Sequence, residues 1–291
     1  MNSIIIFPEN LVDFLYWIKE TTETFWNKVP CEELIYGAKW QPLTDSQIDE
    51  LELKYSITFD FEHRTFLRIL HTIDKHYNEE EEEEKNEEYV LYKKTESEEL
   101  KRVREFWYPP YRPSLFYNWI TEKEWIESRL VWIENLFIKD ILGVNKSWLK
   151  SWGPRPKSYE EQIQIFREWY QKAPRLLPIQ AHTFLMAGDR YGLNPVMSVY
   201  GFDTIIAGWS LRHFLIRKFA EELGLSKISY DEDYPEGYSV LVKGISELDM
   251  LQTIRLDDTV IPYWKEVLTY YNYPGGKCWQ GFLISGEEST L

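Results

Sequence analysis

The order in which helical and strand patterns follow one another along the chain constrains its fold more than any other sequence feature. Apolar residues recur at helical spacing in several segments before Pro174, and short β-branched runs separated by turn residues then occupy residues 177–207. Helical patterns return after this cluster. Helices, then strands, then helices are typical of an α+β domain rather than of alternating βαβ units. We therefore predict a central, mostly antiparallel sheet over residues 177–207, flanked by N-terminal and C-terminal helices.

Three of the predicted helices begin with residues that match a capping box. Thr44, Thr121 and Ser158 are each followed three positions later by Gln or Glu. In such a box the hydroxyl accepts a hydrogen bond from the backbone N–H of that residue, whose side chain reaches back. Gly143 and Pro174 are expected to end two of these helices. Further helices are predicted over 9–28, 60–75, 97–107 and 210–223, and near 262–271 with Pro262 in the first turn.

The predicted sheet contains a hairpin. Residues 195–200 and 204–207 are rich in β-branched side chains, and the connection between them is short, which indicates an antiparallel pair. We place His182 in a preceding strand, between apolar neighbours. Further strands are expected over 238–242 and, as an edge strand, over 278–284.

An acidic block interrupts the apolar patterning after the third predicted helix. Glutamate dominates residues 78–88, and prolines follow at positions 109, 110 and 113. Burying a run of unpaired like charges is prohibitive, so we expect Glu79–Glu84 to be poorly ordered or fully exposed. We interpret 78–113 as an acidic and proline-rich insertion within a single domain that spans residues 1–291.

The formal net charge of −15, from 48 acidic and 33 basic residues, restricts the partners of this chain. A nucleic-acid backbone would be repelled over much of the surface, so we expect no nucleic-acid partner. A basic protein would be attracted, and its encounter with the chain would be accelerated. A nuclease with a cationic groove would fit this description.

The sequence favours a cytoplasmic location. Cys31 and Cys278 are the only cysteines, and they suit neither a disulfide scaffold nor a metal site. The apolar run Ile4–Phe7 follows no basic region and ends at Pro8, which does not fit a signal peptide. No run of about 18 apolar residues is present for a membrane span. We expect no membrane partner.

No sequence pattern points to catalysis or to a cofactor. A glycine-rich phosphate loop, a nucleophile elbow and a zinc-type His/Cys cluster are missing. His71 and His76 are five positions apart and do not share a helix face. We predict a non-enzymatic protein without catalytic residues, metal or cofactor. A hydrolase with weak motifs is the alternative from another class, and it would lose activity on a change of His182.

Two blocks of the sequence resemble the SUKH superfamily, which includes fungal cell-wall-assembly and glucan-synthesis regulators and bacterial toxin-immunity proteins. In the first block, Leu51-Glu52 and Arg64–Leu67 resemble the Leu-Glu pair and the Arg-x-x-Phe-Leu pattern of the family. In the second block, residues 152–156, a proline-bounded strand with His182 and an Asn-Pro-Val hairpin that starts at Asn194 occur in the family's order.

The resemblance implies a SUKH-like fold and a binding function. Bacterial members are typically antitoxins, so the chain is expected to be an immunity protein that neutralises a polymorphic or contact-dependent toxin by direct binding. Fungal members organise signalling and cell-wall synthesis. An interaction scaffold or a regulator without a toxin partner is therefore the alternative.

The motif residues have a structural interpretation, because prolines fix the direction of the chain and large aromatic side chains supply core surface. The alternative is that part of the set lines a ligand or partner groove. The set comprises Trp152, Gly153, Arg155, Pro156, Pro178, His182, Asn194, Pro195, Tyr200 and Asp203, with Trp152 and Tyr200 expected in the core and Asp203 in a turn. The candidate partner-binding residues are Asp231, Glu232, Asp233, Glu79, Glu80 and Glu81, whose charges would steer a basic partner.

Overall fold

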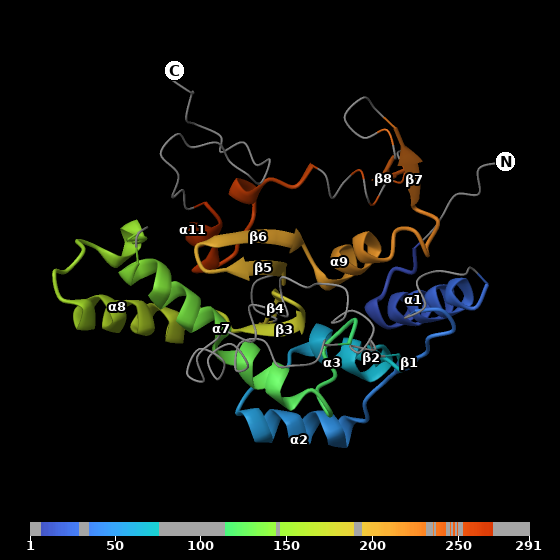
Figure 1. The fold of residues 1–291 in the computed structure, drawn as a ribbon, viewed down its shortest axis with the longest axis horizontal. Helices are drawn as coiled ribbons and strands as arrows, with labels where there is room; N and C mark the ends of the chain where they lie inside the picture. The colour runs from blue at the N-terminus through green and yellow to red at the C-terminus, as the bar shows by residue number, and fades with distance from the viewer. Residues whose placement is uncertain are drawn as a thin grey trace, which may run out of the picture.

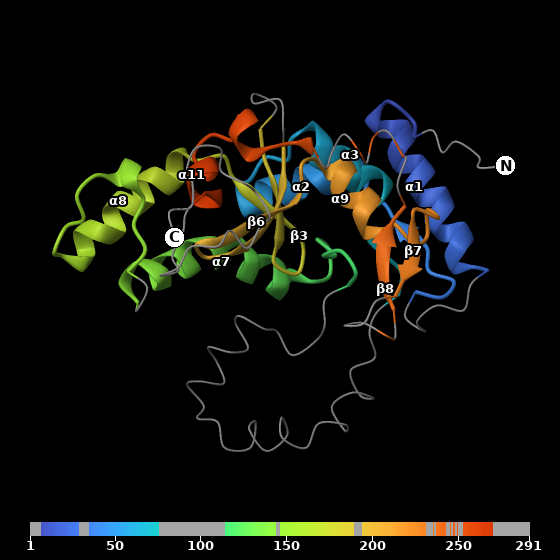
Figure 2. The same cartoon turned by 90° about the horizontal axis from the view of Figure 1, so that it is seen from above.

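The protein has an α+β fold in which a four-stranded antiparallel sheet lies between two groups of helices (Figure 1). The computed structural model describes residues 7–28, 35–75, 114–143, 146–188, 194–230, 235, 237–242, 245, 247, 249 and 253–269. Figure 2 shows α8 at one end of the molecule and α1 at the other, with the sheet between them. Within these ranges, no helix combines the length and the apolar character that a membrane crossing requires.

The central sheet confirms the strand cluster predicted over residues 177–207. Its strands are β3 (Leu176–Gln180), β4 (Thr183–Met186), β5 (Val196–Tyr200) and β6 (Asp203–Gly208), hydrogen-bonded in that order. All three pairings are antiparallel, and β5 and β6 form the expected hairpin.

His182 is not in a strand as predicted. It follows Ala181 in the turn between β3 and β4, and Ala181 has a φ of 47°. The apolar residues on either side of this turn belong to two different strands, and the sequence pattern alone did not separate them.

Alternation along the strands places successive side chains in two different cores, because neighbouring residues of a strand point to opposite faces. Leu185 belongs to the first core, whereas its neighbours Phe184 and Met186 belong to the second. On β5, Val196 likewise belongs to the first core and Met197 to the second. Both faces of the sheet are therefore covered by helices over part of their area.

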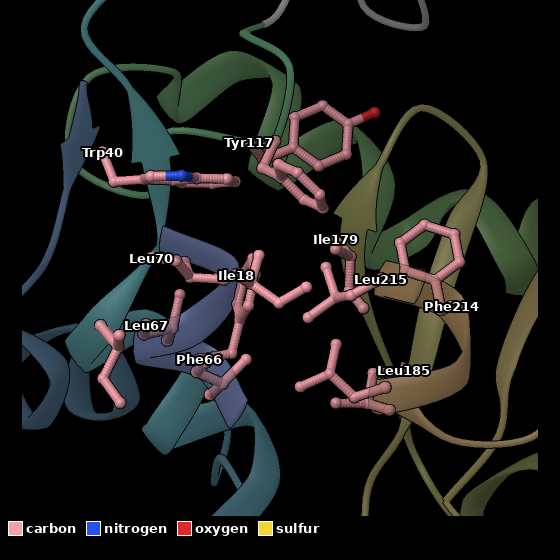
Figure 3. Close-up of a cluster of buried hydrophobic side chains, with 14 of the residues drawn as sticks. Ile18, Trp40, Phe66, Leu67, Leu70, Tyr117, Ile179, Leu185, Phe214 and Leu215 are labelled. Atoms are coloured by element: carbon pink, nitrogen blue, oxygen red, sulfur yellow. The ribbon is translucent and has the colours of Figure 1, made fainter. Parts of the chain in front are cut away.

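The first core joins one face of the sheet to the N-terminal elements and to α9. These elements are α1 (Leu11–Trp26), β1 (Trp40–Gln41), α2 (Asp45–Tyr55), α3 (Phe61–Ile69), β2 (Thr72–Ile73) and α9 (Leu211–Lys218). Figure 3 shows Ile18, Phe66 and Leu70 from this layer close to Ile179 and Leu185 of the sheet. Phe214 and Leu215 of α9 belong to the same buried cluster (Figure 3).

The second core joins the other face to α7 (Lys123–Leu142), η1 (Lys150–Trp152), α8 (Tyr159–Lys172), η2 (Leu256–Asp258) and α11 (Trp264–Leu268). Phe137 of α7 lies at its centre and is fully buried. Its ring contacts the rings of Phe166, Trp169, Phe202 and Trp264, with centroids 4.7–6.4 Å apart. One aromatic side chain of α7 thus contacts three other segments: α8, the β5–β6 turn and α11.

Of the three predicted capping boxes, one is confirmed, one forms only the hydrogen bond to the hydroxyl, and one is wrong. Thr44 and Gln47 form a reciprocal capping box at α2, and the Ser158 hydroxyl accepts from the backbone N–H at the third position of α8. At α7 the N-cap is Glu122, without a side-chain cap. Its carboxylate instead accepts hydrogen bonds from the backbone N–H groups of Ser114 and Asn118, at 2.6 and 2.9 Å. Residues outside the helix therefore determine how this helix begins.

Several predicted boundaries differ from the structure. The third helix ends at Ile69, because His71 adopts a φ of 57° and the chain continues as β2, paired with β1. The helix predicted over 210–223 ends as α9 at Lys218 and is followed by turns. Pro262 precedes α11 instead of lying in its first turn.

A second hairpin was only half predicted. It consists of β7 (Ser226–Ser229) and β8 (Tyr238–Leu241), of which the sequence patterns indicated β8 alone. Several predicted features lie outside the described residues. They are the helix over 97–107, the insertion over 78–113 with Glu79, Glu80 and Glu81, the acidic residues Asp231, Glu232 and Asp233, and the edge strand over 278–284.

Candidate functional site

The motif residues around Trp152 are built into the second core. The Trp152 ring is nearly buried and lies edge-on to Trp148 and Trp169, at centroid distances of 5.0 and 5.7 Å. Gly153 follows with a φ of 75°, and its carbonyl accepts a hydrogen bond from Trp148 Nε1 at 2.8 Å. A residue with a Cβ would be strained at this φ, so the glycine has a conformational role.

Arg155 and Pro156 fasten the end of α7 to the start of α8. The Arg155 guanidinium donates hydrogen bonds to the carbonyls of Ile141 and Lys146 and to the Gln162 side chain. The Gln162 amide donates to the Pro156 carbonyl at 2.8 Å. The carbonyls at a helix C-terminus lack intrahelical partners, so this arginine satisfies groups that would otherwise face solvent or the core.

Asn194, Pro195 and Pro178 shape the sheet and attach it to the N-terminal layer. The Asn194 amide lies 3.4 Å from Asp60, whose other oxygen caps α3 by accepting from the His63 N–H at 2.8 Å. The Pro195 carbonyl accepts from the Met186 N–H at 3.0 Å. Pro178 lies in β3, at the edge of the sheet, where a missing backbone N–H is tolerated.

The first motif block is an ion-pair network between α2 and α3. Arg64 donates to Glu52 at 2.8 Å and to Asp49 at 2.7 Å. The other Glu52 oxygen accepts from the Phe59 backbone N–H at 2.6 Å. This geometry explains why a glutamate on one helix and an arginine on the next occur together.

His182, Tyr200 and Asp203 differ from the other motif residues because they are exposed together at the turn end of the sheet. Tyr200 pairs with Asp203 across β5 and β6. The electrostatic interaction of Asp203 with the His182 imidazole brings the third residue into the group. The prediction that Tyr200 supplies core surface is wrong, because 51% of this residue is accessible.

The strand register extends this group into a continuous surface. Thr183, Ser198 and Ile205 are directly opposite one another on β4, β5 and β6, and they share a face with Tyr200 and Asp203. Further along the strands, the first core covers this same face. At the turn end it is open, and Ile205 is 38% exposed. We name these five residues, together with the neighbouring His182, the open sheet face.

A buried arginine supports the open sheet face from the side of α7. The Arg129 guanidinium lies over the rings of Trp125 and Trp132, at 4.8 and 4.2 Å from their centroids. Its Nε donates to the Tyr117 hydroxyl at 2.9 Å. That hydroxyl donates to the Ala181 carbonyl at 2.6 Å, and burial raises the pKa of Tyr117 to about 12, so the donor proton is retained.

Trp132 connects this support to the strands. Its Nε1 donates to the Val199 carbonyl at 3.1 Å, and its ring lies edge-on to Tyr200, with centroids 5.7 Å apart. Arg129 and Trp132 were not predicted from the sequence, because both look like ordinary positions of an amphipathic helix. Only their contacts with the β3–β4 turn and with β5 give them a role at this surface.

The open sheet face has the chemistry of a contact surface. Partial burial and the charge of Arg129 lower the pKa of His182, while Asp203 opposes this shift, so the imidazole is neutral at pH 7. Among the described residues, no group of three or more His, Cys, Asp and Glu side chains is arranged to hold a metal ion. The hydroxyl, imidazole, carboxylate and aliphatic groups present are suited to hydrogen bonding and apolar contact.

Compared with known protein families, curated proteins and solved structures, the chain matches none of them. The resemblance to the SUKH superfamily therefore stays a prediction from sequence motifs.

Proposed function

We propose that this chain is a non-enzymatic, cytoplasmic immunity protein of the SUKH type, which neutralises a toxin by docking on it. The observation that carries the proposal is the open sheet face, where the exposed motif residues His182 and Tyr200 meet Asp203 and Ile205 on a rigid frame. These side chains contribute little to the packed cores. A role in contact with another protein accounts for their exposure.

The residue types of the open sheet face, and the contacts that hold them in place, are suited to tight binding. Tyrosine offers a large contact area with few rotatable bonds, so it loses little conformational entropy on binding. The Tyr200 ring is already held by Trp132, and its strand is fixed by the hydrogen bond to Val199. Preorganisation of this kind lowers the entropic cost of association, which increases affinity without additional contacts.

The charge of the chain favours a basic target. With a net charge of −15, the molecule should attract a protein whose own site is cationic, as in a nuclease that binds phosphate groups. Asp203 provides a carboxylate within the contact face itself. Docking there would cover the cationic site of the toxin and exclude its substrate.

The test starts from the genes next to the one for this chain, where the proposal expects a gene for a basic toxin. Induced expression of this toxin in a bacterial host should arrest growth, and co-expression of this chain should restore growth. Tyr200→Ala should weaken binding of the purified toxin about thirty-fold, the effect of losing one interface hot spot of about 2 kcal/mol. Tyr159→Ala removes a similarly exposed tyrosine on α8 and should leave the affinity unchanged.

Two results would contradict the proposal. If no neighbouring gene product is toxic, or if the toxin is not bound by this chain, the immunity function is wrong. If the toxin is bound and Tyr200→Ala has the affinity of the unmodified chain, the function is retained but the open sheet face is not the binding site.

A further inference from the structure

A groove runs between α8 and the segment that leads from η2 into α11. Its volume is about 1090 Å³, and η1 contributes to its lining through Ser151 and Trp152. The Trp169 ring lies edge-on to the rings of Trp152 and Tyr263, with centroids 5.7 and 5.9 Å apart, so aromatic side chains connect its walls. Val260 and Tyr263 also line the groove and are 67% and 39% exposed. The groove therefore offers apolar surface to another molecule.

The α8 wall of this groove carries two opposite charges. Glu168 and Lys172 are exposed, lie one helical turn apart and both line the groove. The Glu168 carboxylate accepts a hydrogen bond from Gln164 Nε2 at 2.9 Å, one turn earlier in the helix. Among the described residues, neither Glu168 nor Lys172 forms an ion pair. Both charges are therefore free to pair with charges of another molecule.

Two other charged side chains of the groove are held within the chain. The Lys265 ammonium donates hydrogen bonds to the carbonyls of Asp257 and Thr259, at 2.8 and 3.0 Å. The Glu266 carboxylate accepts from the Ser151 backbone N–H at 3.0 Å. A molecule that approaches α8 along the groove therefore meets a negative charge at residue 168 and a positive charge at residue 172.

This charge pattern is complementary to itself. In an antiparallel pair of α8 helices, with a two-fold axis beside the middle of the turn 168–172, Glu168 of each copy lies opposite Lys172 of the other. Packed helices are about 8–10 Å apart, a distance that these long side chains can span. A two-fold contact forms both ion pairs at once, because the same surface of each copy is used.

The groove also has the size that such a pairing requires. Its volume of about 1090 Å³ equals that of about nine residues of α-helix, taken as a cylinder about 10 Å across. The α8 helix of one copy would lie between α8 and residues 260–263 of the other, and the symmetry gives the second copy the same arrangement. Val260 and Tyr263 would then contact the α8 helix of the other copy.

We propose that two copies of this chain associate through α8, with each copy placing this helix in the groove of the other and two Glu168–Lys172 ion pairs across the two-fold axis. The α8 helix lies at one end of the molecule, where a second copy can approach it (Figures 1 and 2). The net charge of −15 opposes association. At an ionic strength of about 0.15 M this repulsion is screened beyond about 8 Å, whereas charges in contact are screened less. The inference goes beyond the proposed toxin binding and does not depend on it.

The experiment is sedimentation velocity of the complete chain at about 0.15 M salt. We expect a dimer with a micromolar dissociation constant. Glu168→Lys and Lys172→Glu should each weaken it about thirty-fold, because each variant replaces two attractive pairs with two repulsive ones. An equal mixture of the two variants should form a heterodimer, since lysines at 168 and 172 of one chain then face glutamates of the other. The double variant Glu168→Lys/Lys172→Glu should dimerise by itself.

Control variants separate the ion pairs from general effects of charge. Glu161→Lys and Lys157→Glu make the same charge changes at exposed positions that do not line the groove, so the dissociation constant should not change. Tyr200→Ala should remain a dimer, although it weakens toxin binding at the open sheet face. Circular dichroism checks that each variant is folded.

Four outcomes would overturn the inference. They are an unmodified chain that stays monomeric at about 100 μM, a dimer that both single variants leave intact, single variants that do not associate when mixed, and a monomer in which Val260→Lys weakens toxin binding, which would assign the groove to the toxin. A chain that neutralises its toxin through the open sheet face, together with any of the first three outcomes, would keep the proposed function and refute the dimer alone.

Discussion

Replacing His63 with leucine should raise the free energy of unfolding at neutral pH and reduce its loss in acid. The His63 side chain is 1% exposed and lies edge-on to Phe59 and Trp119, with ring centroids 4.7 and 6.1 Å away. Neither ring nitrogen has a hydrogen-bond partner among the described residues. Burial, and then the charge of His71, lower the pKa of His63 from 6.5 to about 3. The folded protein therefore holds this imidazole neutral and without hydrogen bonds.

Two effects determine the expected magnitude. A buried polar group without a partner costs about 1–3 kcal/mol, so its replacement by an apolar side chain of similar volume should stabilise the neutral protein by about 1 kcal/mol after repacking. In acid, the unfolded chain binds a proton at position 63 below pH 6.5, whereas the folded chain does so only near pH 3. Between these values the unfolded state holds more protons, so stability falls as the pH falls.

The acid effect can be calculated over an accessible pH range. Lowering the pH from about 7.5 to about 4.5 takes the unfolded histidine roughly two units below its pKa. At about 1.4 kcal/mol per unit, His63 should contribute about 3 kcal/mol of lost stability over this range. The leucine variant should lack this contribution and keep the losses that arise from all other titrating groups.

Urea unfolding followed by tryptophan fluorescence at several pH values measures this difference. The control is His182→Asn, which removes a histidine whose ring is only partly shielded and whose pKa is lowered less, so the pH dependence should change by a smaller amount. An equal loss in the free energy of unfolding between about pH 7.5 and about 4.5, in His63→Leu and in the unmodified chain, would contradict this prediction.

Three further changes test the packing. His71→Leu should destabilise the protein by about 2 kcal/mol, because the His71 Nε2 accepts a hydrogen bond from the buried backbone N–H of Trp119 at 3.0 Å, and this donor would lose its partner. Urea unfolding measures the change in stability. Phe137→Ala should cost about 4 kcal/mol in urea unfolding, because it leaves a cavity among four aromatic rings, and a loss below about 1 kcal/mol would contradict this. Gly201→Ala should lower the melting temperature for two reasons: the added Cβ would overlap the Asp140 carboxylate, and residue 201 has a φ of 65°, which strains an alanine. An unchanged melting temperature would contradict this prediction and show that α7 moves to accommodate the Cβ.

Local sequence chemistry determined the elements whose causes lie within a few residues. The caps at Thr44 and Ser158 depend on a hydroxyl and a backbone N–H three positions away, so they were predictable. The strand cluster over residues 177–207 was predictable because alternation and turn residues are contained in the strands themselves. The α+β class follows from the order of these local patterns.

Tertiary contacts decided the features that involve partners far away in the sequence. Thr121 matches a capping box, but α7 begins at Lys123 because Ser114 and Asn118 use the Glu122 carboxylate. Very short strands such as β1 carry no period, so only pairing with β2 defines them.

The candidate surfaces also depend on long-range contacts. Sequence motifs named His182, Tyr200 and Asp203, but strand register brought Tyr200 beside Asp203 and left their face of the sheet open. Arg129 supports the surface through Tyr117, whose hydroxyl binds the turn at Ala181. This turn is more than fifty residues away from Arg129 in the sequence. Hydrophobic periodicity predicts which face of a helix or strand is buried. Whether a given side chain is exposed also depends on how far the neighbouring helices extend over that face, which only the tertiary structure decides.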